Sequence, residues 1–253
     1  MSVNPFDLTG KTALVTGANT GLGQGIAIAL AQAGADIALI GRSQPQETLD
    51  ALAAIGVKTH SILTDLGNAD NVANIISEAS EAMGRLDILV NNAGIIKRNE
   101  AIDFTPAEWD DVMNVNLRTL FFLSQAFARH LVAEKAGGKI INIASMLTFQ
   151  GGIRVPSYTA SKSGVGGLTK ALANEWAQHG INVNAIAPGY FATNNTAALQ
   201  ADEKRNTEIL GRIPSGRWGR PSDLGGAAIF LASAASDYVQ GITLPVDGGW
   251  LSR

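Results

Sequence analysis

Short apolar runs alternate with longer amphipathic stretches along the whole chain. Uncharged runs such as 12–16, Thr-Ala-Leu-Val-Thr, have the length and composition of strands buried on both faces. The stretches between such runs show helical periodicity. We expect strands at 12–16, 36–40, 60–63, 88–90, 139–143, 181–186 and 242–246. We expect helices at 26–33, 45–55, 71–83, 106–133 (with a break or bend), 158–178 and 221–232.

This alternation predicts an α/β fold, a single-domain Rossmann-type doubly wound parallel sheet with helices on both faces. No linker, internal repeat or low-complexity tract interrupts it, so residues 1–253 are expected to form one domain. The least regular stretch, 189–215, follows the sixth strand and would lie outside the carboxyl ends of the strands. We interpret this stretch as a substrate lid, the alternative being an ordinary surface insertion.

Composition narrows the class of protein. The chain of 253 residues is 46% hydrophobic and only 16% charged, which indicates a large core or surface buried between subunits. A net charge of −3 without a Lys/Arg cluster argues against nucleic acid or an anionic membrane as partner. No apolar run reaches the roughly 18 residues of a membrane span, and the N-terminus has no leader pattern. We therefore expect a cytoplasmic protein.

Metal and thiol chemistry find no support in the sequence. The chain has no cysteine, which excludes disulfides, thiolate catalysis and Cys-zinc sites. Its histidines, His60, His130 and His179, are too far apart to show metal-ligand spacing. No metal site is expected.

The first expected strand runs into a glycine-rich turn, 16–23, with glycines at Gly17, Gly21 and Gly23. Glycine lets a backbone turn tightly and approach a pyrophosphate. The helix that follows offers free N–H groups and a positive dipole end to the phosphates. The position of the turn between an apolar strand and an apolar helix favours a dinucleotide site over a plain loop.

The end of the second strand determines the choice of cofactor. An acidic residue there binds the ribose of NAD, whereas an Arg accommodates the 2′-phosphate of NADP. The sequence has Arg42 and Ser43 and no acid at this point, which favours NADP. Arg42 as a solvated surface charge is the alternative.

Tyr158 and Lys162 lie four residues apart on one face of an expected helix, thirteen residues after Ser145. A positive charge beside a phenol favours the ionised form and lowers its pKa from about 10. Such a phenol donates a proton to a carbonyl or takes one from an alcohol, and Ser145 would hold the same oxygen. The three residues together suit hydride transfer. A Tyr and a Lys four residues apart are by themselves more often a half-buried aromatic residue beside a lysine that extends its charge into solvent.

In this order and spacing, these elements resemble the short-chain dehydrogenase/reductase family over nearly the whole chain. The segments that carry the resemblance are 16–23, Asp65-Leu66, 91–94 (Asn-Asn-Ala-Gly), Asn116, Ser145, Tyr158-x-x-x-Lys162 and Pro188-Gly189. The resemblance implies one NAD(P)-dependent catalytic domain. Tyr158 would be the general acid/base, Lys162 would lower its pKa and hold the nicotinamide ribose, Ser145 would orient the substrate, and Asn116 would anchor a proton-relaying water.

The glycine turn and the resemblance together predict a cofactor site at the strand ends. Asp65 would lie near the adenine, and Pro188 and Gly189 beside the nicotinamide. For Asn92 a structural role is the stronger interpretation. The expected cofactor-binding residues are Gly17, Asn19, Thr20, Gly21, Leu22, Gly23, Arg42, Ser43, Asp65, Leu66, Asn92, Ala93, Gly94, Tyr158, Lys162, Pro188 and Gly189.

Within the family, segments 145–158, 187–196, 212–219 and 247–253 resemble the bacterial 2-dehydro-3-deoxy-D-gluconate 5-dehydrogenases. This resemblance implies an enzyme that interconverts a ketone and a secondary alcohol on a sugar acid, 2-keto-3-deoxygluconate and 2,5-diketo-3-deoxygluconate. Members of that group are generally NAD-linked, whereas Arg42 favours a phosphate.

A sugar acid needs a cation for its carboxylate and polar groups for its hydroxyls. We expect Arg154 or Arg98 to bind the carboxylate, with a surface salt bridge as the alternative for either. Gln150 and Asn194 would bind hydroxyls, and Ser145 the reacting oxygen.

Other functions stay open at this point. A gluconate 5-dehydrogenase or an acyl-chain ketoreductase would use the same chemistry, and a non-catalytic dinucleotide sensor would use the same fold. The expected helices 106–133 and 158–178 are apolar over much of their circumference, so each must bury a second face. Together with the resemblance, this predicts a homotetramer.

Overall fold

Seven parallel strands form one sheet through the centre of residues 4–253, which the computed structural model describes apart from the side chain of Asn71. The strands are β1 (Thr12–Thr16), β2 (Asp36–Gly41), β3 (Thr59–Leu63), β4 (Ile88–Asn91), β5 (Gly138–Ile143), β6 (Ile181–Pro188) and β7 (Thr243–Val246). Their order is β3-β2-β1-β4-β5-β6-β7. Strands β1 to β3 extend the sheet toward one edge, and β4 to β7 extend it toward the other, so the strand order switches between β1 and β4. Ligands bind at such a switch point in open α/β sheets.

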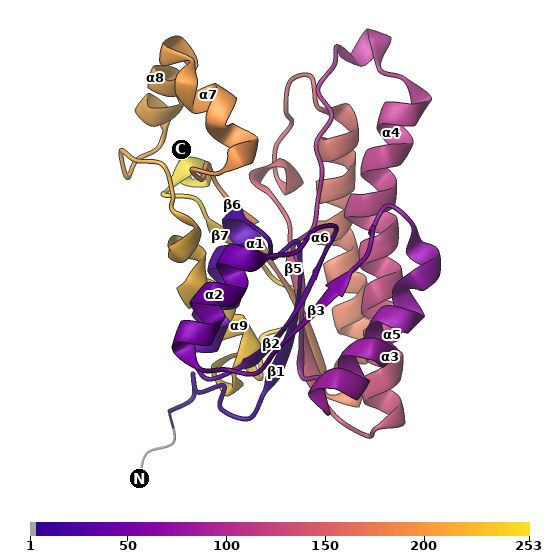
Figure 1. Cartoon of the computed structure of the whole chain (residues 1–253). Coiled ribbons are helices and arrows are strands. Elements are labelled where there is room, and N and C mark those ends of the chain that lie inside the picture. The colour runs from indigo at the N-terminus through magenta and orange to yellow at the C-terminus, as the bar shows by residue number, and fades with distance from the viewer. Residues whose placement is uncertain (1–3) are drawn as a thin grey trace.

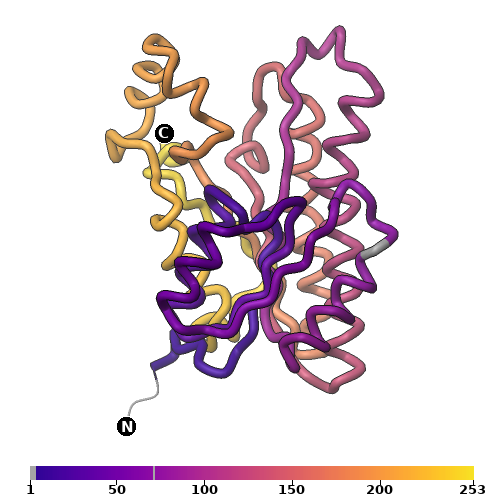
Figure 2. The backbone as a smooth tube through the Cα atoms, in the orientation of Figure 1, coloured from indigo at the N-terminus to yellow at the C-terminus, as the bar shows by residue number. Residues whose placement is uncertain are grey.

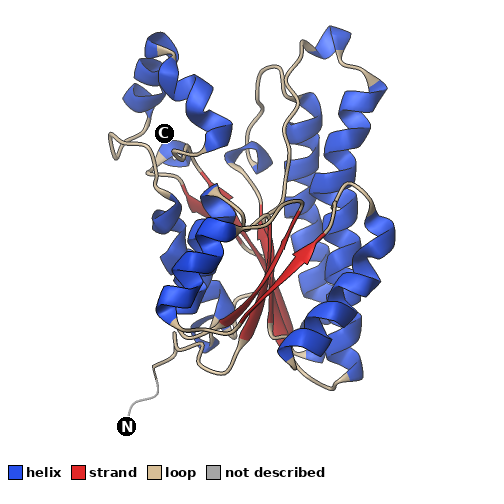
Figure 3. Ribbon diagram, viewed as in Figure 1, coloured by secondary structure: helices blue, strands red, loops and turns tan. Residues whose placement is uncertain are grey.

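Helices cover both faces of the sheet, as the sequence predicts (Figure 3). The helices are α1 (Gly21–Gln32), α2 (Gln46–Ile55), α3 (Val72–Met83), α4 (Pro106–Met113), α5 (Leu120–Ala133), α6 (Pro156–Trp176), α7 (Ala197–Ala201), α8 (Glu203–Arg212) and α9 (Gly225–Ala232). One apolar core lies under α1, α2 and α9, and a second lies under α3, α5 and α6 (Figure 1). The fold is therefore the expected Rossmann-type doubly wound α/β domain.

The break expected within 106–133 is a π-helix. A capping box starts α4, because Thr105 Oγ1 accepts from the Glu108 N–H at 3.2 Å. The π-helical turn, Asn114–Thr119, then separates α4 from α5. Such turns occur most often at functional sites, and this one carries Asn116.

The stretch 189–215 contains a short 3-10 helix, Asn194–Thr196, followed by α7 and α8. The two helices stand beyond the carboxyl ends of the strands, close to the C-terminus (Figures 1 and 2). Ile209 and Ile213 are the buried side of this stretch and pack against Met146 and Trp250.

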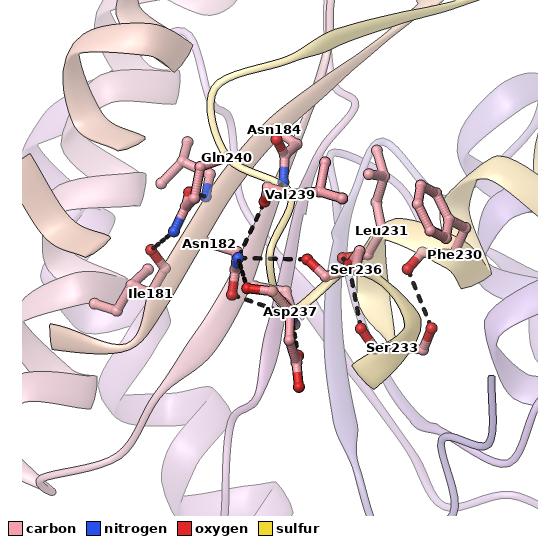
Figure 4. A network of polar contacts seen from close by, with 12 residues as sticks. Ile181, Asn182, Asn184, Phe230, Leu231, Ser233, Ser236, Asp237, Val239 and Gln240 are labelled. Atoms are coloured by element: carbon pink, nitrogen blue, oxygen red, sulfur yellow. Dashed lines mark hydrogen bonds and ion pairs between the residues drawn. The ribbon is translucent and has the colours of Figure 1, made fainter. Parts of the chain in front are cut away.

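Side-chain amides attach the C-terminal part of the chain to β6 (Figure 4). Asn182 donates to the carbonyls of Asp237 and Val239, each at 3.0 Å, and Asn184 donates to Val239 at 2.9 Å. Gln240 both donates to and accepts from the β6 backbone, as a neighbouring strand would. These bonds satisfy buried backbone groups and fix the segment that leads to Trp250.

Candidate active site

The glycine turn is held in shape by Asn92. Its amide donates to the carbonyls of Thr16, at 2.9 Å, and Gly17, at 3.1 Å. Gly17 has φ +65°, and a Cβ at Gly23 would overlap the Gly17 carbonyl and the Asn92 amide. The turn therefore requires glycine at both positions, and Asn92 has the structural role that the sequence favours.

The N-terminus of α1 is open toward the turn. In the described part of the chain, no side chain caps this helix, and its first turn has no acidic residue. Uncapped N–H groups and the positive end of the helix dipole bind phosphate oxygens well. The backbone of residues 17–23 thus fits a pyrophosphate.

Asn19 links the turn to the end of β2. Its amide donates to the Ser43 hydroxyl at 3.0 Å and to the Ser43 carbonyl. A Cβ at Gly41 would overlap the Asn19 side chain, so the two loops touch only because residue 41 is glycine. Arg42 is exposed beside them and forms no hydrogen bond or ion pair with another residue in 4–253. Its guanidinium is available for a phosphate.

One cleft of about 1480 Å³ runs across the carboxyl ends of the strands. Every residue expected to bind cofactor or substrate lines it, including Asp65, Ala93, Pro188 and Asn194. Asn116 is fully buried behind the wall of the cleft. The residues that the sequence predicts for the site therefore line one cleft, while their roles stay predictions.

Tyr158 and Lys162 lie in the first turns of α6, which begins at Pro156. The Lys162 Nζ lies 5.7 Å from the centroid of the Tyr158 ring and donates to the Ile143 carbonyl at 2.5 Å. Ser145 follows β5 and starts the 3-10 helix Met146–Thr148. The three side chains come together because the ends of β5 and the start of α6 meet at the same edge of the sheet.

Burial is the largest influence on the pKa values of Tyr158 and Lys162. It raises the pKa of Tyr158, whereas the nearby Ser145 hydroxyl and the charge of Arg98 lower that pKa. Burial also lowers the pKa of Lys162 to about 8. The lowering of this pKa that the sequence leads us to expect from Lys162 stays a prediction.

Asn116 connects the π-helix to the strand-end loop. Its amide oxygen accepts from the Ile95 N–H at 2.8 Å, and its amide nitrogen donates to the Ile95 carbonyl at 2.9 Å. The same nitrogen lies 3.2 Å from the Ser161 hydroxyl. Gly94 lies close to this amide, since a Cβ there would lie 3.3 Å from the Asn116 amide oxygen.

At the opposite end of the cleft, the expected substrate-binding groups have protein partners. Arg154 has a positive φ of 63°, unusual outside glycine, and its Nε lies 3.1 Å from a Glu100 carboxylate oxygen. Gln150 accepts from the indole N–H of Trp250 at 3.4 Å. Arg98 has no acidic partner among the described residues.

Three residues that sequence reasoning missed also line this end of the cleft. Trp250 is only 5% exposed, and the guanidinium of Arg212 lies 4.0 Å from its ring centroid. Tyr190 packs on the same indole, with ring centroids 4.7 Å apart. A tryptophan within a glycine-rich C-terminus was the available signal, but no local pattern links it to Arg212.

The described residues contain no helix long and apolar enough to cross a bilayer. No group of three or more acidic or histidine side chains suited to a metal ion occurs within them either.

The sheet is all-parallel and doubly wound, and its glycine turn leads into a helix without a side-chain cap. Ser145, Tyr158 and Lys162 meet at the strand ends. These features together define a dinucleotide-dependent oxidoreductase. The sequence profile of the family described as enoyl-(acyl carrier protein) reductase matches residues 17–251. The chain belongs to the short-chain dehydrogenase/reductase family.

Named relatives of known sequence or structure cover the full chain. The 2-dehydro-3-deoxy-D-gluconate 5-dehydrogenase of Escherichia coli is 60% identical over 253 residues, 100% of both chains. A crystal structure from Agrobacterium tumefaciens, described as a 2-deoxy-D-gluconate 3-dehydrogenase with bound NADP, is 60% identical, with a TM-score of 0.93 over 99% of this chain and 100% of that one. A Beutenbergia cavernae structure, described as an NAD(P)-dependent gluconate 5-dehydrogenase with bound NADP at low occupancy, is 48% identical, with a TM-score of 0.94 and the same coverage.

Proposed function

We propose that the protein interconverts a ketone and a secondary alcohol on a sugar acid, using NAD(P) as the hydride carrier. The proposed pair is 2-keto-3-deoxygluconate and 2,5-diketo-3-deoxygluconate, with reaction at C5. The observation that carries the proposal is the meeting of Ser145, Tyr158 and Lys162 in a cleft whose far end is polar and cationic. The full-length likeness to enzymes named for this reaction supports the choice of substrate.

In the proposed mechanism, Tyr158 moves the proton. When bound, the nicotinamide accepts or supplies the hydride at C5. During oxidation the phenolate of Tyr158 takes the proton from the C5 hydroxyl, and during reduction the phenol returns it. Ser145 holds the same oxygen through its hydroxyl, and Arg98 stabilises the phenolate by its charge.

Lys162 and Asn116 support this proton transfer. Lys162 is 4% exposed, and its ammonium is held near the phenol by the Ile143 carbonyl. We propose that it also binds the nicotinamide ribose. Asn116, fixed by the Ile95 backbone, would position the water that leads the proton onward.

Arg42 supports a preference for NADP. Its guanidinium has no partner among residues 4–253, and the neighbouring Ser43 hydroxyl and Asn19 amide add hydrogen-bonding groups beside it. Arginine binds phosphate with two parallel hydrogen bonds. NAD would lose those bonds and meet no compensating acid at this point of the chain.

At the substrate end we propose that Gln150 and Asn194 bind hydroxyl groups. Stretch 189–215 would act as the lid over them. A cation at this end of the cleft would bind the carboxylate. Of the two arginines that the sequence predicts for this role, Arg154 already pairs with Glu100, while Arg98 lacks an acidic partner among the described residues.

A rate assay tests the proposal. Purified protein is mixed with 2-keto-3-deoxygluconate or D-gluconate and with NAD or NADP, and reduced nicotinamide is followed by absorbance. Faster turnover of the deoxy-keto acid supports the proposal. Faster turnover of D-gluconate would favour the alternative, a gluconate 5-dehydrogenase. Cofactor binding without turnover of any ketone or alcohol would identify a dinucleotide sensor and overturn the enzyme proposal.

We also propose that the chain works as a homo-oligomer, a tetramer by resemblance, in the cytoplasm. An apolar groove of about 490 Å³ opens on α4, α5 and α6. Its lining includes Met113, Leu117, Phe121, Phe122 and Leu168. A second copy would bury this surface. Light scattering should give a mass of several chains, and Leu117→Asp should lower that mass.

A further inference from the structure

The substrate end of the cleft has five cationic side chains, and three are already paired. Lys97 lies 3.1 Å from Asp111, Arg154 lies 3.1 Å from Glu100, and Arg205 lies 2.8 Å from Glu208. The other two, Arg98 and Arg212, have no acidic partner within residues 4–253. A substrate carboxylate would meet competition at the paired cations, so Arg98 and Arg212 are the stronger candidates.

Arg98 is poorly fixed for binding a carboxylate. It is exposed, and it forms no hydrogen bond, ion pair or aromatic stack with another of the described residues. Its guanidinium would therefore have to be ordered at the moment the substrate binds, which costs conformational entropy.

Arg212, by contrast, is held in place by a buried side chain. It is the last residue of α8, and its guanidinium stacks on the buried indole of Trp250 at 4.0 Å. Stacking uses the face of the guanidinium and leaves its N–H groups, which lie in the plane, free for a carboxylate. Trp250 is itself fixed by Gln150 and Tyr190, so the fork is held before substrate arrives.

A short chain of contacts connects this fork to the reacting centre. Met146, the neighbour of Ser145, packs against Ile209, Ile213 and Trp250. Arg212 therefore lies on the lid side of the cleft, stacked on a member of the apolar cluster that also contains the neighbour of Ser145. Figure 1 shows α8 and the C-terminus together above the strand ends.

We propose that Arg212, stacked on Trp250, binds the C1 carboxylate of the substrate and so selects acids over neutral polyols. The inference rests on the proposed function and adds a specificity-determining residue to it. It also couples the lid to the substrate, because α8 carries the binding group.

The test compares variants of Arg212 with a control on the same helix. Arg212→Gln should raise KM for 2-keto-3-deoxygluconate by about tenfold to a hundredfold, since a charged hydrogen-bonded pair is lost. Its kcat should stay near the wild-type value, because the lost contact is uniform binding. Arg212→Lys should recover only part of the loss, since an ammonium lacks the fork. Lys204→Gln, which removes an exposed cation from the same helix outside the lining of the cleft, should leave both constants unchanged.

The same variants, loaded with NADP, are titrated with D-gluconate by calorimetry, so the inference is tested even without turnover. Weaker binding by Arg212→Gln alone supports it. Unchanged KM and affinity in Arg212→Gln, or the same losses in Arg98→Gln instead, would overturn it. A wild-type protein that turns over neutral ketones and binds no sugar acid would overturn the proposed function and this inference together. Wild-type turnover of the acid with a silent Arg212→Gln would overturn the inference alone.

Discussion

The two ends of the cleft are built in different ways. At the cofactor end, side chains such as Asn92 and Asn116 bond to nearby backbone and fix the shape of loops. At the substrate end, charged side chains on separate segments pair with one another, as Arg154 does with Glu100, and much of their surface stays exposed. The cofactor end is lined by backbone that side-chain amides hold in place, whereas the substrate end is lined by charged side chains.

The two kinds of construction should respond differently to substitution. At Gly23 an added atom would overlap the backbone of the turn, so substitution there should impair folding and cofactor binding together. Exposed pairs contribute little to stability, so substitutions at the substrate end should change substrate choice and leave the fold intact.

Tyr158 lies where the two ends meet, and its loss should have the largest effect. Tyr158→Phe removes the proton donor and acceptor but keeps the ring. Turnover should fall by about 10²–10⁴-fold, while the affinity for NADP, measured by fluorescence titration, stays near wild type. Activity within a few-fold of wild type would contradict the role given to the phenol.

A pair of glycine-to-alanine changes compares the two ends directly. At Gly23 a methyl group would overlap the Gly17 carbonyl and the Asn92 amide, so the turn must shift. Gly23→Ala should lower the free energy of unfolding by about 1–3 kcal/mol and weaken NADP binding. At Gly211 in α8, a Cβ would meet nothing within 4 Å.

Gly211→Ala serves as the matched control for that change. It should raise the free energy of unfolding by about 0.5–1 kcal/mol, because alanine favours a helix. Urea unfolding of both variants measures the two effects. Equal destabilisation at the two positions would remove the contrast between the ends of the cleft.

Arg42→Gln examines the cofactor end without disturbing its backbone. The variant should raise KM for NADP by about tenfold to a hundredfold, since charged hydrogen bonds to a phosphate are lost. KM for NAD should change little. Parallel loss with both cofactors would show that Arg42 acts on the loop rather than on a 2′-phosphate.

Lys162→Met should inactivate the enzyme and yet stabilise the fold. Burial lowers the pKa of Lys162 from 10.5 to about 8, so the unfolded chain binds the proton more tightly than the native protein does. Stability from this group is therefore present above pH 10.5 and lost as the pH falls through 8. At pH 7 the variant should be more stable by about 1–2 kcal/mol, after allowing for its lost hydrogen bond.

Urea unfolding at pH 7 and near pH 10.5 checks that sign. The advantage of Lys162→Met should shrink at the higher pH, where the lysine is neutral in the native protein and half neutral in the unfolded chain. A variant less stable than wild type at both values would mean that the hydrogen bond to Ile143 outweighs the cost of burial.

The sequence predicted which residues of the cofactor end and of the catalytic cluster meet in one cleft, because they lie at strand ends and at helical spacing, while their roles stay predictions. Periodicity predicted the seven strands, the longer helices and a break within 106–133. It did not predict the place or the π-helical form of that break, or the separate helices α7 and α8. Contacts between distant segments were not predictable. The stack of Arg212 on Trp250 joins α8 to the C-terminal segment, and no local pattern encodes it. The pairing of Arg154 with Glu100 is of the same kind.

The most direct test of the proposed reaction follows the hydrogen at C5. The wild-type protein is incubated with NADP and with 2-keto-3-deoxygluconate deuterated at C5, and the reduced cofactor is examined by mass spectrometry. If the hydride comes from C5, the reduced nicotinamide should carry one deuterium and the product should be 2,5-diketo-3-deoxygluconate. Reduced cofactor without deuterium would place the oxidation at another carbon and contradict the proposed function.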